Sequence, residues 1–179
     1  EALPVLGGML SVGIPEFRLP REILKMEIEG IRQLGVEMKT HHPFLWRGDG
    51  KDFQKFGFHA AFLSVGAHRS LKLNIPGEVL QGVLPGVEFL RELNLGKKIK
   101  LGKKVVVLGG GNVAVDVARS ALRLGAKVVE IYYRRSRDEM PAISEEVDEA
   151  IREGVEIHFL ASPIKIIGKG GRAKGMECI

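Results

Sequence analysis

The chain has 179 residues, a formal net charge of +5 and 45% hydrophobic residues, an ordinary composition for a globular protein with a sizeable core. No run of about 18 apolar residues predicts a membrane span, and no signal peptide is recognisable. The single cysteine, Cys178, excludes an internal disulfide and a cysteine-rich metal or iron–sulfur motif. The positive charge suits an anionic ligand, but no aromatic platform for nucleic acid accompanies it. We therefore expect a cytoplasmic protein without membrane or nucleic-acid partners.

The first part of the chain predicts a helix followed by short strands. Residues 20–34 have helical periodicity. The expected buried stripe of this helix consists of Leu24, Ile28, Ile31 and Leu34. Residues 36–40 predict a short strand, and residues 52–56 predict a loop or a piece of a hairpin. The apolar run HAAFLSV at residues 59–65 predicts a buried strand.

A strand, a glycine turn and a helix follow one another after residue 103. Residues 105–108 are apolar without alternation, which is typical of a strand covered on both faces. Glycines occupy the next three positions, and a helical pattern then runs from Asn112 to near Gly125. Its expected apolar face consists of Val113, Val117, Leu122 and Leu124, with Ala114, Ala118 and Ala121 among them.

The spacing of Gly109, Gly111 and Ala114 matches GxGxxA, the dinucleotide fingerprint with alanine in its third place. Gly109 permits a sharp turn, Gly111 permits close approach of the backbone to a pyrophosphate, and Ala114 permits close packing of helix and strand. Unpaired N–H groups at the helix N-terminus then bind the anion. We assign this contact to Gly109, Gly110, Gly111, Asn112 and Val113. The alternative is a purely structural glycine turn.

The end of the next strand, expected over residues 128–133, selects the cofactor. A site for NAD usually places an acid there for the ribose 2′-hydroxyl, whereas a 2′-phosphate attracts arginine. Glu130 lies inside the strand, and the strand is followed by Arg134, Arg135 and Arg137. We therefore predict NADP(H), with Arg134 and Arg135 on the 2′-phosphate and Arg137 as a weaker candidate. A solvated basic turn is the alternative.

The last part of the chain predicts a helix, a strand and a hairpin. Helical periodicity over residues 143–154 comes from Ile143, Val147, Ala150 and Ile151. The opposite face, which we expect to face water, carries Glu145, Glu146, Asp148 and Glu149. Residues 155–160 predict the third strand of the sheet. Residues 164–167 and 173–179 flank a glycine-rich turn, which is a hairpin signal.

The sequence contains no nucleophilic triad and no metal-ligand pattern. His41 and His42 are expected to be exposed in a turn, and no third ligand follows at a useful spacing. His158 is expected to be a packing residue. We therefore assign no catalytic residue and no metal.

Three stretches, VVVLGGGNVAVDVARSALRLGA, YYRRSRDEMPA and GVEIHFLASPIKI, closely resemble the small (beta) subunit of bacterial glutamate synthase and its relatives. That family includes electron-bifurcating ferredoxin:NADP oxidoreductases and the NADPH-binding module of dihydropyrimidine dehydrogenase. The N-terminal stretch GGMLSVGIPEFRLPREIL resembles the flavin-side segment of the family. The resemblance implies an α/β protein in which a Rossmann-like dinucleotide-binding βαβ lobe for NADP follows a truncated FAD-domain segment.

The resemblance also implies two domains, a partial FAD-binding segment over residues 1–82 and an NAD(P)-binding domain over residues 83–179. It implies that Glu1 bonds the ribose of FAD, that Met9 lies in a flavin-contacting turn and that Arg18 lies at the flavin site. Compared with the family, the chain looks like a fragment that lacks pieces at both ends, including the last strand of the NADP lobe. We expect such a fragment to be inactive alone, to bind no FAD and to self-associate through exposed sheet edges.

In an intact member, the resemblance implies that hydride passes from C4 of NADPH to N5 of FAD. Electrons then pass through iron–sulfur clusters to a large glutamate synthase subunit or a ferredoxin-like partner. The cofactors supply this chemistry, and the protein aligns them. We therefore predict the NADPH-binding part of a flavoprotein oxidoreductase of the glutamate synthase small-subunit type. The alternative is a non-catalytic nucleotide-binding or docking domain.

Overall fold

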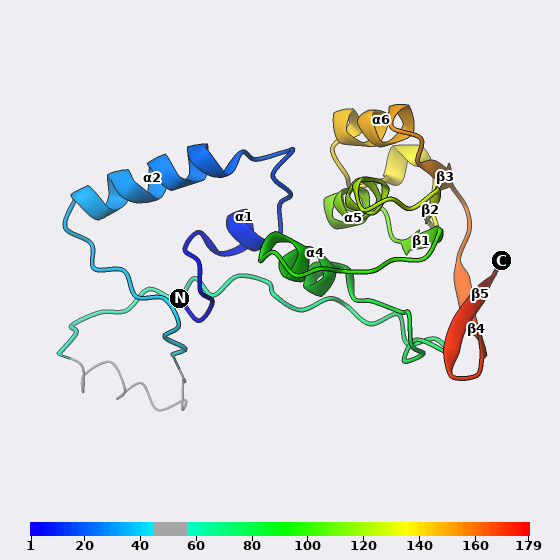
Figure 1. Ribbon diagram of the computed structural model, residues 1–179, viewed down its shortest axis with the longest axis horizontal. Coiled ribbons are helices and arrows are strands. Elements are labelled where there is room, and N and C mark those ends of the chain that lie inside the picture. The colour runs from blue at the N-terminus through cyan, green and yellow to red at the C-terminus, as the bar shows by residue number, and fades with distance from the viewer. Residues whose placement is uncertain (45–56) are drawn as a thin grey trace. The chain divides into compact units, whose positions relative to one another are not determined.

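The computed structural model describes residues 1–44 and 57–179. The chain divides into two compact units, Glu1–His68 and Arg69–Ile179. Figure 1 shows their helices and strands. The loop or hairpin piece expected at residues 52–56 lies outside the described residues. None of the helices in the described ranges is long and apolar enough to cross a bilayer.

The first unit contains two helices, α1 (Gly8–Val12) and α2 (Arg21–Gln33). The predicted helix after Pro20 is confirmed, but its predicted buried stripe is wrong in its second half. Leu24 is buried, whereas Ile31 and Leu34 are 48% and 83% exposed. Within the described residues, the contact of α2 with the turn at Gly7 is made by side-chain atoms of Leu24 and Ile28, and the end of the helix remains exposed.

The two strands predicted in the first unit are absent from its described part. Residues 36–40 and 59–65 have no strand conformation, and the second segment is exposed along its whole length. An apolar run becomes a strand only when a neighbouring strand accepts its backbone hydrogen bonds, and no described strand lies beside either segment. His41 and His42 are exposed, as predicted. Their N–H groups donate to the carbonyls of Leu3 (3.1 Å) and Glu1 (2.9 Å).

The second unit has the predicted α/β order. Its elements are α4 (Gly86–Asn94), β1 (Lys104–Leu108), α5 (Asn112–Arg123), β2 (Val128–Tyr132), η1 (Arg137–Glu139), α6 (Ser144–Arg152), β3 (Glu156–His158), β4 (Pro163–Lys169) and β5 (Arg172–Cys178). Strands β1, β2 and β3 form a parallel sheet in that order, and β4 and β5 form an antiparallel hairpin. The Rossmann-like βαβ unit and the hairpin are therefore confirmed.

The core of the second unit lies between the parallel sheet and the helices α5 and α6. The sheet contributes Val107, Val129 and Ile131, and α6 contributes Val147 and Ala150. The buried face of α5 consists of Ala114, Val115, Ala118 and Ala121. The predicted face was therefore wrong in part, since Val113 and Leu124 are 40% and 37% exposed. Small side chains let the helix lie close to the sheet, and the larger ones are displaced to its margins.

Residues 69–82 pack within the second unit. Ser70 Oγ donates to Glu88 Oε2 on α4 (2.6 Å), and the N–H of Ile166 in β4 donates to the carbonyl of Pro76 (2.8 Å). Gly77 has φ +88°, and a Cβ there would lie 2.2 Å from the Ile166 carbonyl oxygen. The boundary between the two compact units in the sequence therefore falls between His68 and Arg69. The assignment of FAD and NAD(P) to residues 1–82 and 83–179 stays a prediction.

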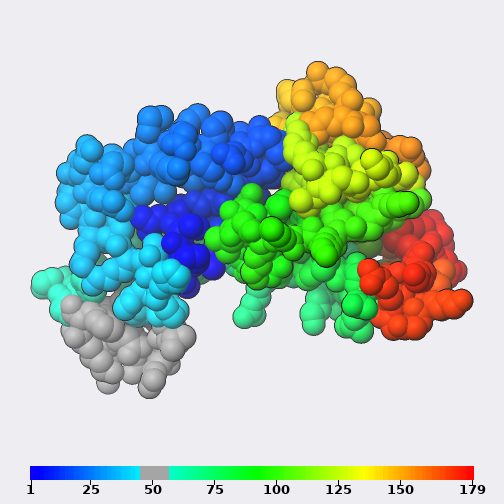
Figure 2. All heavy atoms as spheres, viewed as in Figure 1, coloured from blue at the N-terminus to red at the C-terminus, as the bar shows by residue number. Residues whose placement is uncertain are grey.

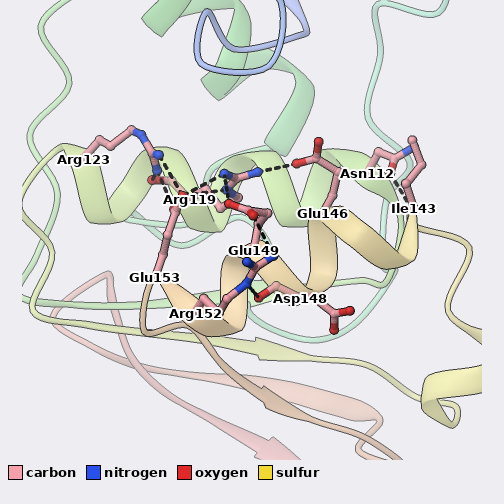
Figure 3. A network of polar contacts seen from close by, with 9 residues as sticks. All are labelled: Asn112, Arg119, Arg123, Ile143, Glu146, Asp148, Glu149, Arg152 and Glu153. Atoms are coloured by element: carbon pink, nitrogen blue, oxygen red, sulfur yellow. Dashed lines mark hydrogen bonds and ion pairs between the residues drawn. The ribbon is translucent and has the colours of Figure 1, made fainter.

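Helices α5 and α6 are joined by a network of ion pairs centred on Arg119 (Figure 3). The Arg119 side chain is only 7% exposed, and its guanidinium bonds Glu146 and Glu153, the latter at 2.7 Å. Arg123 also bonds Glu153, at 2.6 Å. The atoms of α6 (orange) lie directly on those of α5 (yellow-green) in Figure 2.

This network corrects in part the expectation that the acidic face of α6 points to water: Glu145 and Asp148 are exposed, whereas Glu146 and Glu149 are half-buried. Glu146 and Glu149 approach Arg119, Glu149 also bonds Arg152 (2.6 Å), and Asp148 bonds an arginine of the preceding turn. The pKa of Glu153 falls from 4.5 to about 2, chiefly because Arg123 and Arg119 hydrogen-bond its ionised form.

The Glu153 carboxylate is expected to stabilise the second unit above pH 4.5 and to lose this effect as the pH falls towards 2. Replacement by Gln should lower the free energy of unfolding at pH 7 by about 2–3 kcal/mol, because Arg119 and Arg123 lose their shared partner. Urea unfolding followed by circular dichroism at pH 7 and near pH 2 would measure this. The control is Glu145→Gln on the exposed side of the same helix. The prediction is contradicted if Glu153→Gln and Glu145→Gln lower the free energy of unfolding equally, or if the loss caused by Glu153→Gln is the same near pH 2 as at pH 7.

Candidate nucleotide-binding site

The glycine turn, residues 109–111, connects β1 to α5 and requires glycine at two positions. Gly109 has φ +129°, a conformation that residues with a side chain rarely adopt. A Cβ at Gly110 would lie 2.6 Å from ring carbons of Tyr133, so no side chain fits there. The spacing motif had indicated the need for glycine at position 109. The need for glycine at position 110 depends on Tyr133, which directly follows β2, and was not visible in the motif.

The N-terminus of α5 has the properties of an anion site. Gly111 is its N-cap residue, no side chain caps the helix, and a Cβ at Gly111 would meet nothing within 4 Å. The N–H groups of Gly111, Asn112 and Val113 donate to no acceptor within residues 1–44 and 57–179. These free donors and the helix dipole suit a phosphate group that approaches through the open side of the turn.

The segment before α6 is attached to the glycine turn. The N–H of Ala142 donates to the carbonyl of Gly110 (3.1 Å), and the N–H of Ile143 donates to Asn112 Oδ1 (2.9 Å; Figure 3). The side chain of Asn112 therefore accepts a hydrogen bond, whereas its backbone N–H donates to no acceptor among the described residues. These two bonds fix the start of α6 beside the start of α5.

The arginine turn, residues 134–137, lies at the same edge of the sheet as the glycine turn. Strands β1 and β2 are parallel neighbours with Leu108 opposite Tyr132, so the residues that come after both strands meet at one edge. The Gly109 N–H donates to the Tyr132 carbonyl at 3.1 Å. The structure thus brings the predicted pyrophosphate residues and the predicted 2′-phosphate residues together.

The three arginines of this turn differ in their surroundings. Arg134 and Arg135 are exposed. Among the described residues, Arg134 makes no side-chain hydrogen bond or ion pair, whereas Arg135 lies close enough to Glu139 to help lower its pKa. Arg137 is ion-paired with Asp148 of α6. Arg134 is therefore the most available cation of the turn, and Arg137 is already engaged.

The residues with predicted flavin roles belong to the first unit. Glu1 Oε1 accepts a hydrogen bond from the N–H of Leu3 (2.8 Å), and Glu1 is exposed. Met9 and Arg18 are half-buried, and Met9 contacts the backbone of Gly13. These contacts describe local turns, and the flavin roles of Glu1, Met9 and Arg18 stay predictions.

A polar cluster occupies the sheet face that is directed away from α5. Glu130 bonds Lys104 Nζ (2.7 Å) and Tyr132 Oη (3.2 Å), and the lysine holds the pKa of Glu130 below its usual value. Ligand atoms of Glu130, Glu156 and His158 lie within 4.8 Å of one another. The Lys104 ammonium already lies against Glu130 where a cation would bind, and His158 stacks on Tyr132 with ring centroids 4.5 Å apart, as a packing residue does.

The parallel sheet, the glycine turn and the open helix N-terminus define an α/β nucleotide-binding protein. The family comparison agrees. The chain belongs to the pyridine nucleotide-disulphide oxidoreductase family, which matches residues 9–178.

Two relatives and one solved structure show the range of similarity. The chain is 49% identical to the NADP(+)-dependent formate dehydrogenase subunit beta of Moorella thermoacetica, covering all of this chain and 26% of that protein. It is 33% identical to the glutamate synthase [NADPH] small chain of Escherichia coli, covering 98% of this chain and 40% of that protein. The fold matches Mycobacterium tuberculosis FprA in complex with NADPH with a TM-score of 0.73 and 19% identity, over 99% of this chain and 59% of that one.

These comparisons confirm the family resemblance and refine one expectation. Glutamate synthase small chains are relatives, but the formate dehydrogenase subunit is the more similar of these two proteins. The chain spans between a quarter and two fifths of the length of the two relatives.

Replacement of Gly110 by Ala is expected to destabilise the second unit, because the new methyl group overlaps the Tyr133 ring. The expected loss is about 2–3 kcal/mol in the free energy of unfolding. Gly111→Ala is the matched control: its φ is −89° and its surroundings are open, so it should cost about 1 kcal/mol or less. Thermal unfolding of both variants measures the difference. Equal destabilisation by the two substitutions would show that the Tyr133 contact does not restrict the turn.

Proposed function

We propose that this chain binds NADPH and forms the NADPH-binding part of a flavoprotein oxidoreductase. The observation that supports this is the placement of free helix N–H groups and unengaged arginine side chains at one edge of the sheet. The backbone from Gly109 to Val113 binds the pyrophosphate, and Arg134 and Arg135 bind the 2′-phosphate. Arg137 contributes less, because Asp148 already neutralises it.

The preference for NADPH over NADH rests on the residues at the end of β2 and directly after it. An NAD site needs an acid free to accept from the ribose 2′-hydroxyl. Glu130 is 7% exposed and bonded to Lys104 within the sheet, so it is unavailable for that role. The formate dehydrogenase and glutamate synthase relatives both carry NADP(H) in their names, which supports the same choice.

The chain's own residues bind and orient the nucleotide. NADPH supplies hydride chemistry when it is bound, with FAD as the acceptor in the whole protein. The glycine turn holds the pyrophosphate by backbone N–H groups, and the attachment of Ala142 and Ile143 to this turn keeps the donors in place before the nucleotide arrives. Glu1, Met9 and Arg18 serve on the flavin side.

The electron acceptor beyond FAD belongs to the proposal as well. One relative is named as a subunit and the other as a small chain, which favours a separate electron-transfer partner. The family resemblance implies that electrons reach this partner through iron–sulfur clusters. The higher identity to the formate dehydrogenase subunit favours a redox enzyme of that kind, with glutamate synthase as the second candidate.

Calorimetric titration with NADPH and NADH tests the nucleotide assignment. NADPH should bind more tightly, and Arg134→Ala should weaken NADPH binding by about 1.5–3 kcal/mol because a charge-assisted bond to the 2′-phosphate is lost. NADH binding should stay nearly unchanged. Arg172→Ala, on the exposed β5, removes the same charge from another part of the unit. The assignment fails if Arg134→Ala weakens both nucleotides equally, or if Arg172→Ala has the same effect as Arg134→Ala.

A further inference from the structure

The backbone of the arginine turn is fastened to the chain segment after β3. The N–H of Tyr133 donates to the carbonyl of His158 (2.9 Å), and the N–H of Ala161 donates to the carbonyl of Tyr133 (3.1 Å). The N–H of Leu160 donates to the carbonyl of Arg135 (3.1 Å). None of these bonds uses an arginine side chain. Backbone bonds to residues 158–161 therefore hold the first half of the turn, and the guanidinium groups of Arg134 and Arg135 remain available to a ligand.

Glu139, at the end of η1, holds the second half of the turn. Its Oε2 accepts hydrogen bonds from the N–H of Ser136 (3.1 Å) and from Ser136 Oγ (2.9 Å). Its carbonyl accepts a hydrogen bond from the hydroxyl of Tyr133 (2.8 Å). The Tyr133 ring lies against Gly110. Tyr133 therefore connects Glu139, which follows the arginine turn, to the glycine turn.

We propose that Glu139 is a positioning residue for nucleotide selection: by holding Ser136, the residue after Arg135, it fixes the end of the turn so that Arg134 and Arg135 stay where a 2′-phosphorylated dinucleotide requires them. This inference rests on the proposed function of the same site. A turn that is ordered before binding loses less conformational entropy when the phosphate arrives, so its arginines contribute more to affinity.

The charge of Glu139 argues that its contribution is positional. A carboxylate beside a phosphate site repels the anion, so direct electrostatics would favour its absence. The hydrogen bonds from Ser136 and the nearby Arg135 favour the ionised form of Glu139 and lower its pKa, so the negative charge is retained beside the site. The adjacent acid, Asp138, is exposed and makes no comparable side-chain bond in the described part of the chain. Substitution of Asp138 removes a negative charge alone, whereas substitution of Glu139 by Ala also removes the hydrogen bonds to Ser136. Comparing the two separates the effect of charge from the effect of these bonds.

The test compares Glu139→Ala, Glu139→Gln and Asp138→Ala by calorimetric titration with NADPH and NADH. Glu139→Ala should reduce the ratio of the two affinities about tenfold, with NADH binding nearly unchanged. Glu139→Gln should retain the ratio to within about twofold, because one amide oxygen replaces Oε2 as acceptor for both bonds. Asp138→Ala should keep or raise the ratio, since it removes only a negative charge.

A second measurement needs no nucleotide. Amide hydrogen exchange at Ser136 should accelerate in Glu139→Ala and stay unchanged in Glu139→Gln and Asp138→Ala. The proposal is overturned if Glu139→Ala keeps the affinity ratio and the exchange rate of the wild type, or if Glu139→Gln loses as much as Glu139→Ala. It is also overturned if both nucleotides weaken equally. A wild-type protein without any preference for NADPH would instead contradict the proposed function itself.

Discussion

The contact between Gly110 and the ring of Tyr133 is the constraint on which the rest of the site depends. It joins the residue in the middle of the glycine turn to the residue directly before the arginine turn, and a methyl group at Gly110 is enough to disturb it. Through the Tyr133 hydroxyl the same contact reaches Glu139, and through the Gly110 carbonyl it reaches Ala142. Three chain segments are thereby held around one helix N-terminus by bonds within the protein.

The helices behind this site are fixed by two kinds of interaction. Alanine side chains on α5 allow close packing on the sheet, and Arg119 joins α5 to α6 through Glu146 and through Glu153, which Arg123 also bonds. A buried guanidinium must keep its partners, because an unpaired charge in the core is costly. The position of α6 is thus determined by ion pairs along its length and by the bonds from Ala142 and Ile143, just before it, to the glycine turn.

Much of the second unit was predictable from sequence because its signals are local. The strand, glycine turn and helix follow one another directly, and parallel pairing of β1 and β2 then places Arg134 at the same edge of the sheet as Gly109. The Arg119 network had a visible but unused signal: Arg119 and Arg123 are one helical turn apart, and Glu146, Glu149 and Glu153 share one helix face. Only packing of α5 against α6 shows that these faces meet.

The sequence alone determined the class of this protein, since the spacing of Gly109, Gly111 and Ala114 and the arginines after β2 depend only on neighbours in the chain. The tertiary structure decided the features that depend on distant partners. It placed Val115 and the alanines of α5 in the core, engaged Arg137 with Asp148, and left residues 59–65 without a strand partner among the described residues. Burial, ion pairing and strand pairing each need a second surface, and a linear pattern does not specify which surface that is.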